Sequence, residues 1–289
     1  MSRFLREEKG KEVLASINGI TLTREDIAKF GDVVHDYSPI HRDVETAKKH
    51  GFIKDTPVIG VHLAAIGGRI SRNLLSIMQT PDKKFYFTTK TVTFRAPVYP
   101  GEQINWIIEE EQGEEDSRSY SLIIPNAEPE KKPGVELLSE FKTSRPSPQT
   151  YDLEKLVYRE EIEITPKEVK EFYEGLREEP LKEVPFSLGI ARIPSTLLSF
   201  VGELNKIHGT NIGGKNIEMK STSYEDLQTG KGRVDIYEVL KKGRGNRVSY
   251  IFQGVLYQNE QPIMESEITT MTNGEIDIRS LRPRHELAA

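Results

Sequence analysis

The hydrophobic pattern at the start of the chain occurs a second time near its middle. Thr23 and Thr165 each precede apolar residues at helical spacing, and each is followed three positions later by an acidic residue. A threonine with an acidic residue three positions on is typical of a helix N-terminus. We therefore expect an amphipathic helix after each threonine. The apolar positions are Ile27, Phe30 and Val34 in the first copy, and Val169, Phe172 and Leu176 in the second.

A second, almost wholly apolar stretch follows in each half. Pro57 precedes the first of these stretches, residues 58–70, and Pro194 precedes the second, residues 195–207. Proline is favoured at the first position of a helix because its missing N–H has no intrahelical partner there. A helix that is apolar on nearly every side must be buried on nearly every side. The pattern predicts one central helix in each half.

Segments typical of antiparallel strands follow both central helices. They are rich in β-branched and aromatic residues and are separated by Gly, Pro and Asn. Helices followed by consecutive strands favour an α+β fold with a sheet wrapped on the helix. The predicted strands are residues 85–87, 91–96, 103–108, 119–124 and 137–143 in the first half, and 217–220, 233–240, 248–257 and 263–269 in the second.

The repeat predicts two tandem domains. Residues 144–152 contain two prolines and lie between the two sets of strands, so we place the boundary there. The N-terminal domain would span residues 1–146 and the C-terminal domain residues 147–289. Chance similarity of two α+β domains is the alternative interpretation. The agreement of caps, prolines and strand order favours duplication.

Composition narrows the class of protein. The net charge of −5 is small for 289 residues, with acidic and basic residues interspersed, so nothing resembles a nucleic-acid-binding face. The chain has no cysteine, which excludes disulfides and thiolate metal sites and fits a reducing compartment. Residues 1–9 contain no apolar core of signal-peptide length, and no apolar run in the chain is long enough for a membrane span. We therefore expect a cytoplasmic protein without a membrane partner.

The candidate chemistry lies between the first two predicted helices, in residues 34–43. Asp36 and His41 flank Pro39, which disfavours helix for the residue before it and makes a turn there. A carboxylate and an imidazole on one loop can perform general acid–base work on a water molecule near neutral pH. An Asp and a His in a polar loop are more often structural or solvated. Their spacing alone therefore leaves both interpretations open.

The surroundings of this loop resemble a known family. Asp-x-x-Pro-Ile-His, an Ala six positions later, and a Pro57-initiated apolar helix are similar to the signature of the MaoC-like, (R)-specific enoyl-CoA hydratases, also called hydratase 2. The motif covers about residues 30–63, while the order of elements fits both halves. The resemblance implies a hot-dog fold, in which an antiparallel sheet curls around a central helix. Two hot dogs, here fused in one chain, would pair as a working unit.

The resemblance also implies roles for individual residues. Asp36 and His41 would hold a water molecule and add it to the 2,3 double bond of a trans-2-enoyl thioester, giving an (R)-3-hydroxyacyl-CoA. His41 would take a proton from the water, and Asp36 would supply the proton to C2. A backbone N–H at the start of the central helix would stabilise the thioester enolate. This points to Gly60, with Val61 as its neighbour; close helix–sheet packing is the alternative role of Gly60.

This sequence departs from the family pattern at several positions. Ser38 replaces the Asn that orders the family's loop, and His35 replaces the Gly before the Asp. The usual His-Gly at the helix start appears as Gly60-Val61-His62, so the identity of the donating amide stays open. His62 either points toward the substrate or is a hydrogen-bonded residue of the core.

The second half has no counterpart of the loop motif, since residues 177–183 contain a Pro but no His. One working site per chain follows. The glycine-rich residues 209–215 match no nucleotide-binding fingerprint, although Lys215 or Lys220 could meet a CoA phosphate.

The expected ligand is therefore an acyl-CoA, with an acyl carrier protein as the alternative carrier. No metal or redox cofactor is expected, and association of two such chains as a homodimer is left open. A hot-dog thioesterase and a non-catalytic acyl-CoA-binding protein are the alternatives to the hydratase.

Overall fold

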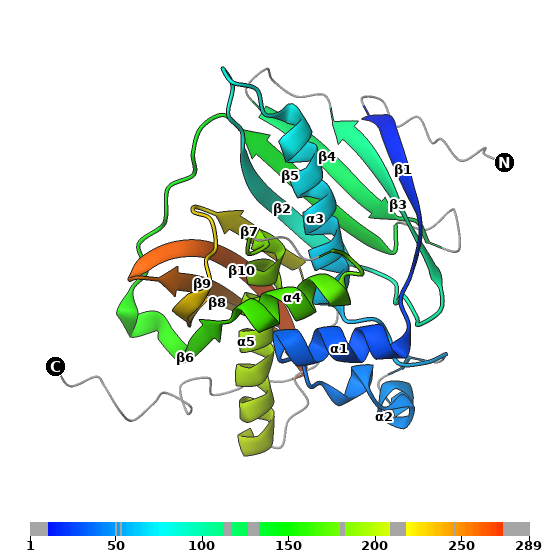
Figure 1. Cartoon of the computed structure of the whole chain (residues 1–289). Helices are drawn as coiled ribbons and strands as arrows, with labels where there is room; N and C mark the ends of the chain where they lie inside the picture. Colours follow the sequence, from blue (N-terminus) through cyan, green and yellow to red (C-terminus); the bar gives the residue numbers. More distant parts are fainter. Residues whose placement is uncertain are drawn as a thin grey trace.

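Ten strands form one continuous antiparallel sheet in the computed structural model, and the helices lie on one face of it (Figure 1). The structure describes residues 11–49, 51–52, 54–111, 117–126, 133–179, 183–208, 218–244 and 247–273. Within these residues, no helix is long and apolar enough to cross a membrane.

The two halves share the order strand, helix, long helix and four strands, and differ in the short helices η1, α2 and η2. The first half comprises β1 (Lys11–Thr21), α1 (Arg24–Val34), η1 (Pro39–His41), α2 (Val44–Lys49), α3 (Gly60–Met78), β2 (Tyr86–Phe94), β3 (Gln103–Glu111), β4 (Ser117–Ile124) and β5 (Val135–Lys142). The second comprises η2 (Leu153–Lys155), β6 (Leu156–Ile164), α4 (Pro166–Gly175), α5 (Phe186–His208), β7 (Glu218–Ser223), β8 (Gly230–Arg244), β9 (Arg247–Gln258) and β10 (Gln261–Asn273).

The sheet order shows the repeat directly. It runs β1-β3-β4-β5-β2 and then β7-β10-β9-β8-β6, so the second half repeats the first in mirrored order. The halves join where β2 pairs with β7, with Thr88 opposite Thr222 and Thr93 opposite Glu218. The predicted α+β class with a repeated pattern is confirmed. The exact boundary between residues 146 and 147 stays a prediction.

The predicted N-terminal caps are present in both halves. Thr23 Oγ1 accepts the N–H of Asp26, and the Asp26 carboxylate accepts the N–H of Thr23, which completes a capping box. Thr165 Oγ1 accepts the N–H of Glu168 in the same way. Helices α1 and α4 then pack against each other through Phe30 and Phe172, whose ring centroids lie 5.4 Å apart.

Several sequence-based predictions of element boundaries were wrong. Each half opens on a strand, β1 or β6, and not on a helix. These two strands form the edges of the sheet, so their side chains are partly solvated. In neither strand do buried and exposed side chains alternate regularly, and β1 also has two register shifts. Residues 86–94 form one strand, with a register shift after Thr89, where two separate segments were predicted.

Helix α5 begins at Phe186 and therefore contains Pro194, where we predicted its start. An interior proline costs about 3 kcal/mol, because it removes one backbone hydrogen bond and crowds the preceding turn. The turns before Pro194 bury Leu188, Ile190 and Ile193 almost completely. Burying each such side chain contributes about 1.5–3 kcal/mol, which outweighs the cost of the proline.

Candidate active site

The candidate loop is fixed to the end of α1 by a left-handed residue. His35 has φ 60° and ψ 32°, and the N–H of Asp36 donates to Gly31 O at 2.8 Å. A Cβ on Gly31 would lie 2.9 Å from the Asp36 carbonyl oxygen and 3.0 Å from Arg42 Nη2. Only glycine therefore permits the loop to approach α1 this closely. The Asp36 side chain is thereby turned into the protein, where it is 2% exposed.

Only one of the two oxygens of the Asp36 carboxylate has a partner. Oδ1 accepts the N–H of Ser38 at 3.0 Å, whereas Oδ2 is buried without a hydrogen-bond partner among the described residues. The backbone N–H of Ser38 makes this bond, and the Ser38 hydroxyl makes no capping bond at the start of η1. A buried oxygen without a partner is uncommon and points to a ligand, a water molecule or a proton at this position.

His41 is held in one tautomer. Its Nδ1 lies 2.8 Å from the carbonyl oxygen of Pro57, which can only accept a hydrogen bond. Nδ1 therefore carries the proton, and the neutral ring has its lone pair on Nε2. The His41 N–H also donates to Ser38 O at 3.1 Å, so the backbone of Ser38 connects His41 to Asp36. This geometry leaves Nε2 available as a base.

The same contact places His41 beside the start of α3, because Pro57 precedes Gly60 by three residues. Ile59 gives α3 no side-chain cap, and among the described residues neither Gly60 N–H nor Val61 N–H has a backbone partner. Helix N-termini carry partial positive charge and bind anions through such free N–H groups. A donor for a developing oxyanion is therefore available near the imidazole.

Close packing alone does not require glycine at position 60. A Cβ there would lie 3.4 Å from the Phe94 ring, which is ordinary van der Waals contact. Gly60 is also partly exposed, whereas the Val61 side chain is buried in the core.

His62 lies between the two halves and away from solvent. Its side chain is completely buried, Nε2 lies 2.9 Å from Gly175 O, and the ring stacks on Phe30 with centroids 3.9 Å apart. Nδ1 is buried without a partner. Burial, opposed by the bond to Gly175, lowers the pKa of His62 to about 4, so the ring is neutral at pH 7. Of its two predicted roles, this geometry fits the core residue.

Equivalent positions in the second half carry different chemistry. Arg177, with φ 59°, ends α4 as His35 ends α1, and the N–H of Glu178 donates to Tyr173 O as that of Asp36 does to Gly31 O. Glu178 thus stands in the position of Asp36, where Arg69 pairs with it. Phe186 begins α5 as Gly60 begins α3. Pro180 and residues 209–215, including Lys215, lie outside the described residues; Lys220 pairs with Glu218 and Glu267.

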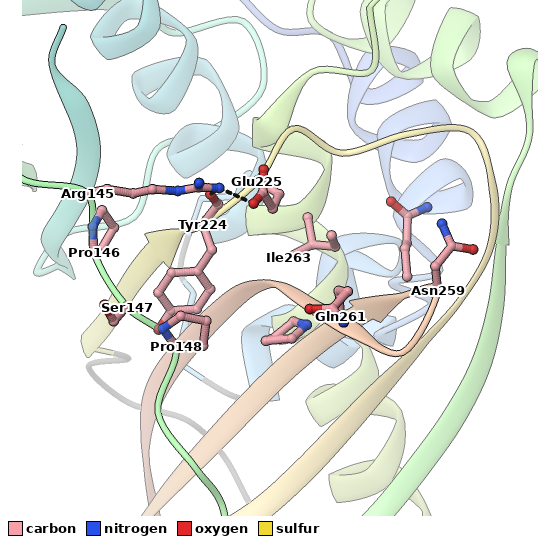
Figure 2. Close-up of a pocket in the computed structure, with 11 residues that line it drawn as sticks. Arg145, Pro146, Ser147, Pro148, Tyr224, Glu225, Asn259, Gln261 and Ile263 are labelled. Carbon is pink, nitrogen blue, oxygen red and sulfur yellow. Dashed lines mark hydrogen bonds and ion pairs between the residues drawn. The ribbon is translucent and has the colours of Figure 1, made fainter.

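A pocket of about 510 Å³ lies away from the Asp36–His41 loop, between residues 145–148, which connect the two halves, and the turn between β9 and β10 (Figure 2). It contains none of the predicted site residues. Several of its polar groups already have partners: Arg145 donates to Tyr224 O and pairs with Glu225, and Gln258 exchanges hydrogen bonds with the backbone of Gln228. No group of three potential metal ligands occurs in the described ranges.

The sequence did not reveal two members of the site. Pro57 was expected to start a helix, but its carbonyl oxygen fixes the His41 tautomer. Phe94 was expected only as a strand residue, but its ring lies against the start of α3. Pro57 lies three residues before α3 begins at Gly60, so its carbonyl oxygen stands outside the hydrogen-bond ladder of the helix, a placement that the sequence alone did not give. The position of Phe94 follows from the tertiary fold alone.

Comparison with known proteins supports this description. The family model described as "MaoC like domain" matches residues 7–126. No curated protein matches the chain by sequence.

Most of the chain superimposes on several solved structures, in both halves. A MaoC-like dehydratase has a TM-score of 0.60 at 10% identity, covering 92% of this chain and 98% of that one. A structure described as a MaoC domain protein dehydratase from Chloroflexus aurantiacus also has a TM-score of 0.60, at 11% identity, covering 91% and 96%. A conserved hypothetical protein from Mycobacterium tuberculosis with a double hot-dog fold has 0.56 at 7% identity, covering 89% and 95%. Residues 7–126 of this chain therefore match the MaoC-like domain, and the chain as a whole has a double hot-dog fold.

Proposed function

We propose that this chain is a hydro-lyase that reversibly adds water to a trans-2-enoyl-CoA and gives an (R)-3-hydroxyacyl-CoA. The observation that carries the proposal is the His41 imidazole, whose tautomer is fixed by Pro57 O and which shares a loop with the half-paired Asp36 carboxylate. The match of residues 7–126 to the MaoC-like domain supports the same class of reaction.

The residues divide the reaction between them. Nε2 of His41 accepts a proton from a water molecule as the water oxygen forms its bond to C3. Electrons of the double bond move to the thioester oxygen, where the free N–H groups of Gly60 and Val61 stabilise the negative charge. Asp36, protonated on Oδ2, then delivers a proton to C2. The proton held by His41 returns to Asp36 or to solvent, so the net change is addition of one water molecule.

The reaction requires no metal or redox cofactor. We place one site in each chain, because the second half has no counterpart of His41 and its Glu178 is paired with Arg69. Phe186 also stands where Gly60 begins α3. The second half would then form a wall of the pocket. Pairing of two chains as a homodimer stays a prediction, which light scattering on the purified protein tests.

The test is an assay with crotonyl-CoA that follows both the absorbance of the conjugated double bond and the release of free thiol. We expect loss of absorbance without thiol release. Asp36→Asn and His41→Ala should each lower kcat by about 10²–10⁴-fold, the usual contribution of a general acid or base. Asp82→Asn, on an exposed turn, is the matched control and should retain full activity.

Other outcomes separate the alternatives. Thiol release would indicate a thioesterase. CoA binding without either reaction would indicate a binding protein. Full activity of Asp36→Asn and His41→Ala would show that the chemistry lies outside this loop.

A further inference from the structure

The end of the β8–β9 hairpin carries a concentrated positive charge. Residues 241–247 read Lys-Lys-Gly-Arg-Gly-Asn-Arg, with four cations and no acid, in a chain whose net charge is −5. Lys241 and Lys242 are exposed, as are Val239 (45%) and Leu240 (39%) just before them. A register shift between Glu238 and Leu240 accompanies this exposed pair of apolar residues. The hairpin thus combines cations with an apolar surface.

The sheet register places this hairpin at the same end as the candidate site. Phe94, which lies against Gly60, follows Thr93 at the end of β2. One row of paired residues crosses the sheet from β2 to β8, so Thr93 of β2 and Leu240 of β8 lie at the same level along the strands. The row consists of Thr93, Glu218 of β7, Thr269 of β10, Ile251 of β9 and Leu240. Lys241 and Lys242 continue β8 beyond this row.

The lateral distance follows from the strand order. Four strand spacings separate β2 from β8, which at roughly 4.8 Å each gives about 19 Å. In CoA, 13 covalent bonds connect the thioester sulfur to the nearer phosphorus of the diphosphate. An extended chain advances roughly 3.5 Å per three bonds, so this arm spans on the order of 15 Å. The 3′-phosphate and adenine lie beyond it.

We propose that the β8–β9 hairpin binds the 3′-phosphate and diphosphate of the CoA carrier, with Lys241 and Lys242 as contacts from the described side chains. Val239 and Leu240 offer apolar surface to the adenine. This inference rests on the proposed function, because it takes the thioester to lie at Gly60. It assigns to the second half the recognition of the carrier, while the first half performs the chemistry. It also identifies CoA, and not a carrier protein, as the bearer of the acyl group.

The test compares two substrates that differ only in the phosphate-bearing part. Crotonyl-CoA and crotonyl-pantetheine are assayed with the unaltered protein and with the double variant Lys241→Ala/Lys242→Ala. We expect the variant to raise KM for crotonyl-CoA about tenfold, equivalent to two exposed charge contacts, and to leave crotonyl-pantetheine unchanged. The effect should shrink at high salt, which screens exposed charges.

The matched control removes two exposed lysines from other surfaces. Lys167→Ala/Lys231→Ala changes the net charge equally and should leave both substrates unaffected; Lys231 lies on β8 near the end opposite the basic hairpin. An unchanged KM for crotonyl-CoA in Lys241→Ala/Lys242→Ala would overturn the proposal. An equal rise for both substrates would also overturn it, because the hairpin would then act on the reacting centre.

Calorimetry with 3′,5′-ADP separates this inference from the proposed function. Binding to the unaltered protein that weakens about tenfold in Lys241→Ala/Lys242→Ala supports the carrier site even if no hydration is detected. Absence of 3′,5′-ADP binding, or equal binding by both proteins, overturns the carrier site even if crotonyl-CoA is hydrated.

Discussion

Acid should destabilise this protein through His62. The ring is fully buried and its pKa in the folded state is about 4, against an ordinary value of 6.5. Between these values the unfolded chain binds a proton that the folded chain does not, so the free energy of unfolding falls as the pH falls. The stabilising contribution is complete above pH 6.5 and is lost toward pH 4. The pKa difference of 2.5 units limits the total loss of unfolding free energy to about 3 kcal/mol, at 1.36 kcal/mol per unit. About 2 kcal/mol of this loss has occurred when the pH reaches 5.

The measurement is urea unfolding between pH 7 and pH 5 at one protein concentration, followed by fluorescence. The chain has a single tryptophan, Trp106, which is completely buried and therefore reports on global unfolding. His62→Gln keeps an N–H donor for Gly175 O but cannot gain a charge. The variant should be less stable at pH 7, because it loses the stack on Phe30. Between pH 7 and pH 5, the free energy of unfolding of the variant should fall by about 2 kcal/mol less than that of the unaltered protein.

Comparison of the two slopes removes the contribution of carboxylates and other histidines, since both proteins contain them. Parallel curves for the unaltered protein and His62→Gln would refute the reasoning. They would mean that the unfolded and folded states bind the same number of protons at position 62.

Three further substitutions test individual contacts. Gly254→Ala should lower the free energy of unfolding by about 2–3 kcal/mol in urea, because its Cβ would lie 2.1 Å from Cγ2 of the buried Ile193; a neutral result would contradict the close approach of α5 to β9. Gly60→Ala should leave the melting temperature nearly unchanged, because its Cβ only touches Phe94, yet lower kcat/KM for crotonyl-CoA; a stability loss with full activity would assign Gly60 to packing. Asp235→Ala should cost about 3 kcal/mol of stability in urea unfolding, because the 1%-exposed carboxylate accepts bonds from two arginines and a tyrosine; a loss below 1 kcal/mol would contradict this.

The parts of the fold that the sequence predicted are those with strong local signals. Thr23 and Thr165 mark helix starts by a mechanism that needs only the next three residues. The strands after each central helix were recognised because one face of each is buried, which imposes alternation. Strands β1 and β6 were not predicted because edge strands bury fewer side chains, so their hydrophobic alternation is weak; residues 13–16 of β1 are all exposed.

The candidate site was only partly predictable for a similar reason. Asp36 and His41 could be named from the loop motif, but their orientation depends on partners distant in sequence or on the backbone. The His41 tautomer depends on a carbonyl 16 residues away, and the burial of Asp36 depends on the left-handed His35 that ends α1. A residue type can be read from a sequence, whereas the atom that it presents to a substrate is set by the tertiary fold.

The length of the loop explains why only the first half carries this arrangement. From His35, the left-handed residue after α1, to Gly60 the chain advances 25 positions, whereas from Arg177, the left-handed residue after α4, to Phe186 it advances 9. The additional 16 positions accommodate η1 and α2, and with them the turn that brings His41 to Pro57 O. Placing Asp and Gly at positions 178 and 186 would therefore not create a second site, because residues 177–183 contain no histidine. The arrangement of Asp36 and His41 in the first half thus depends on the length of this loop as much as on its residue types.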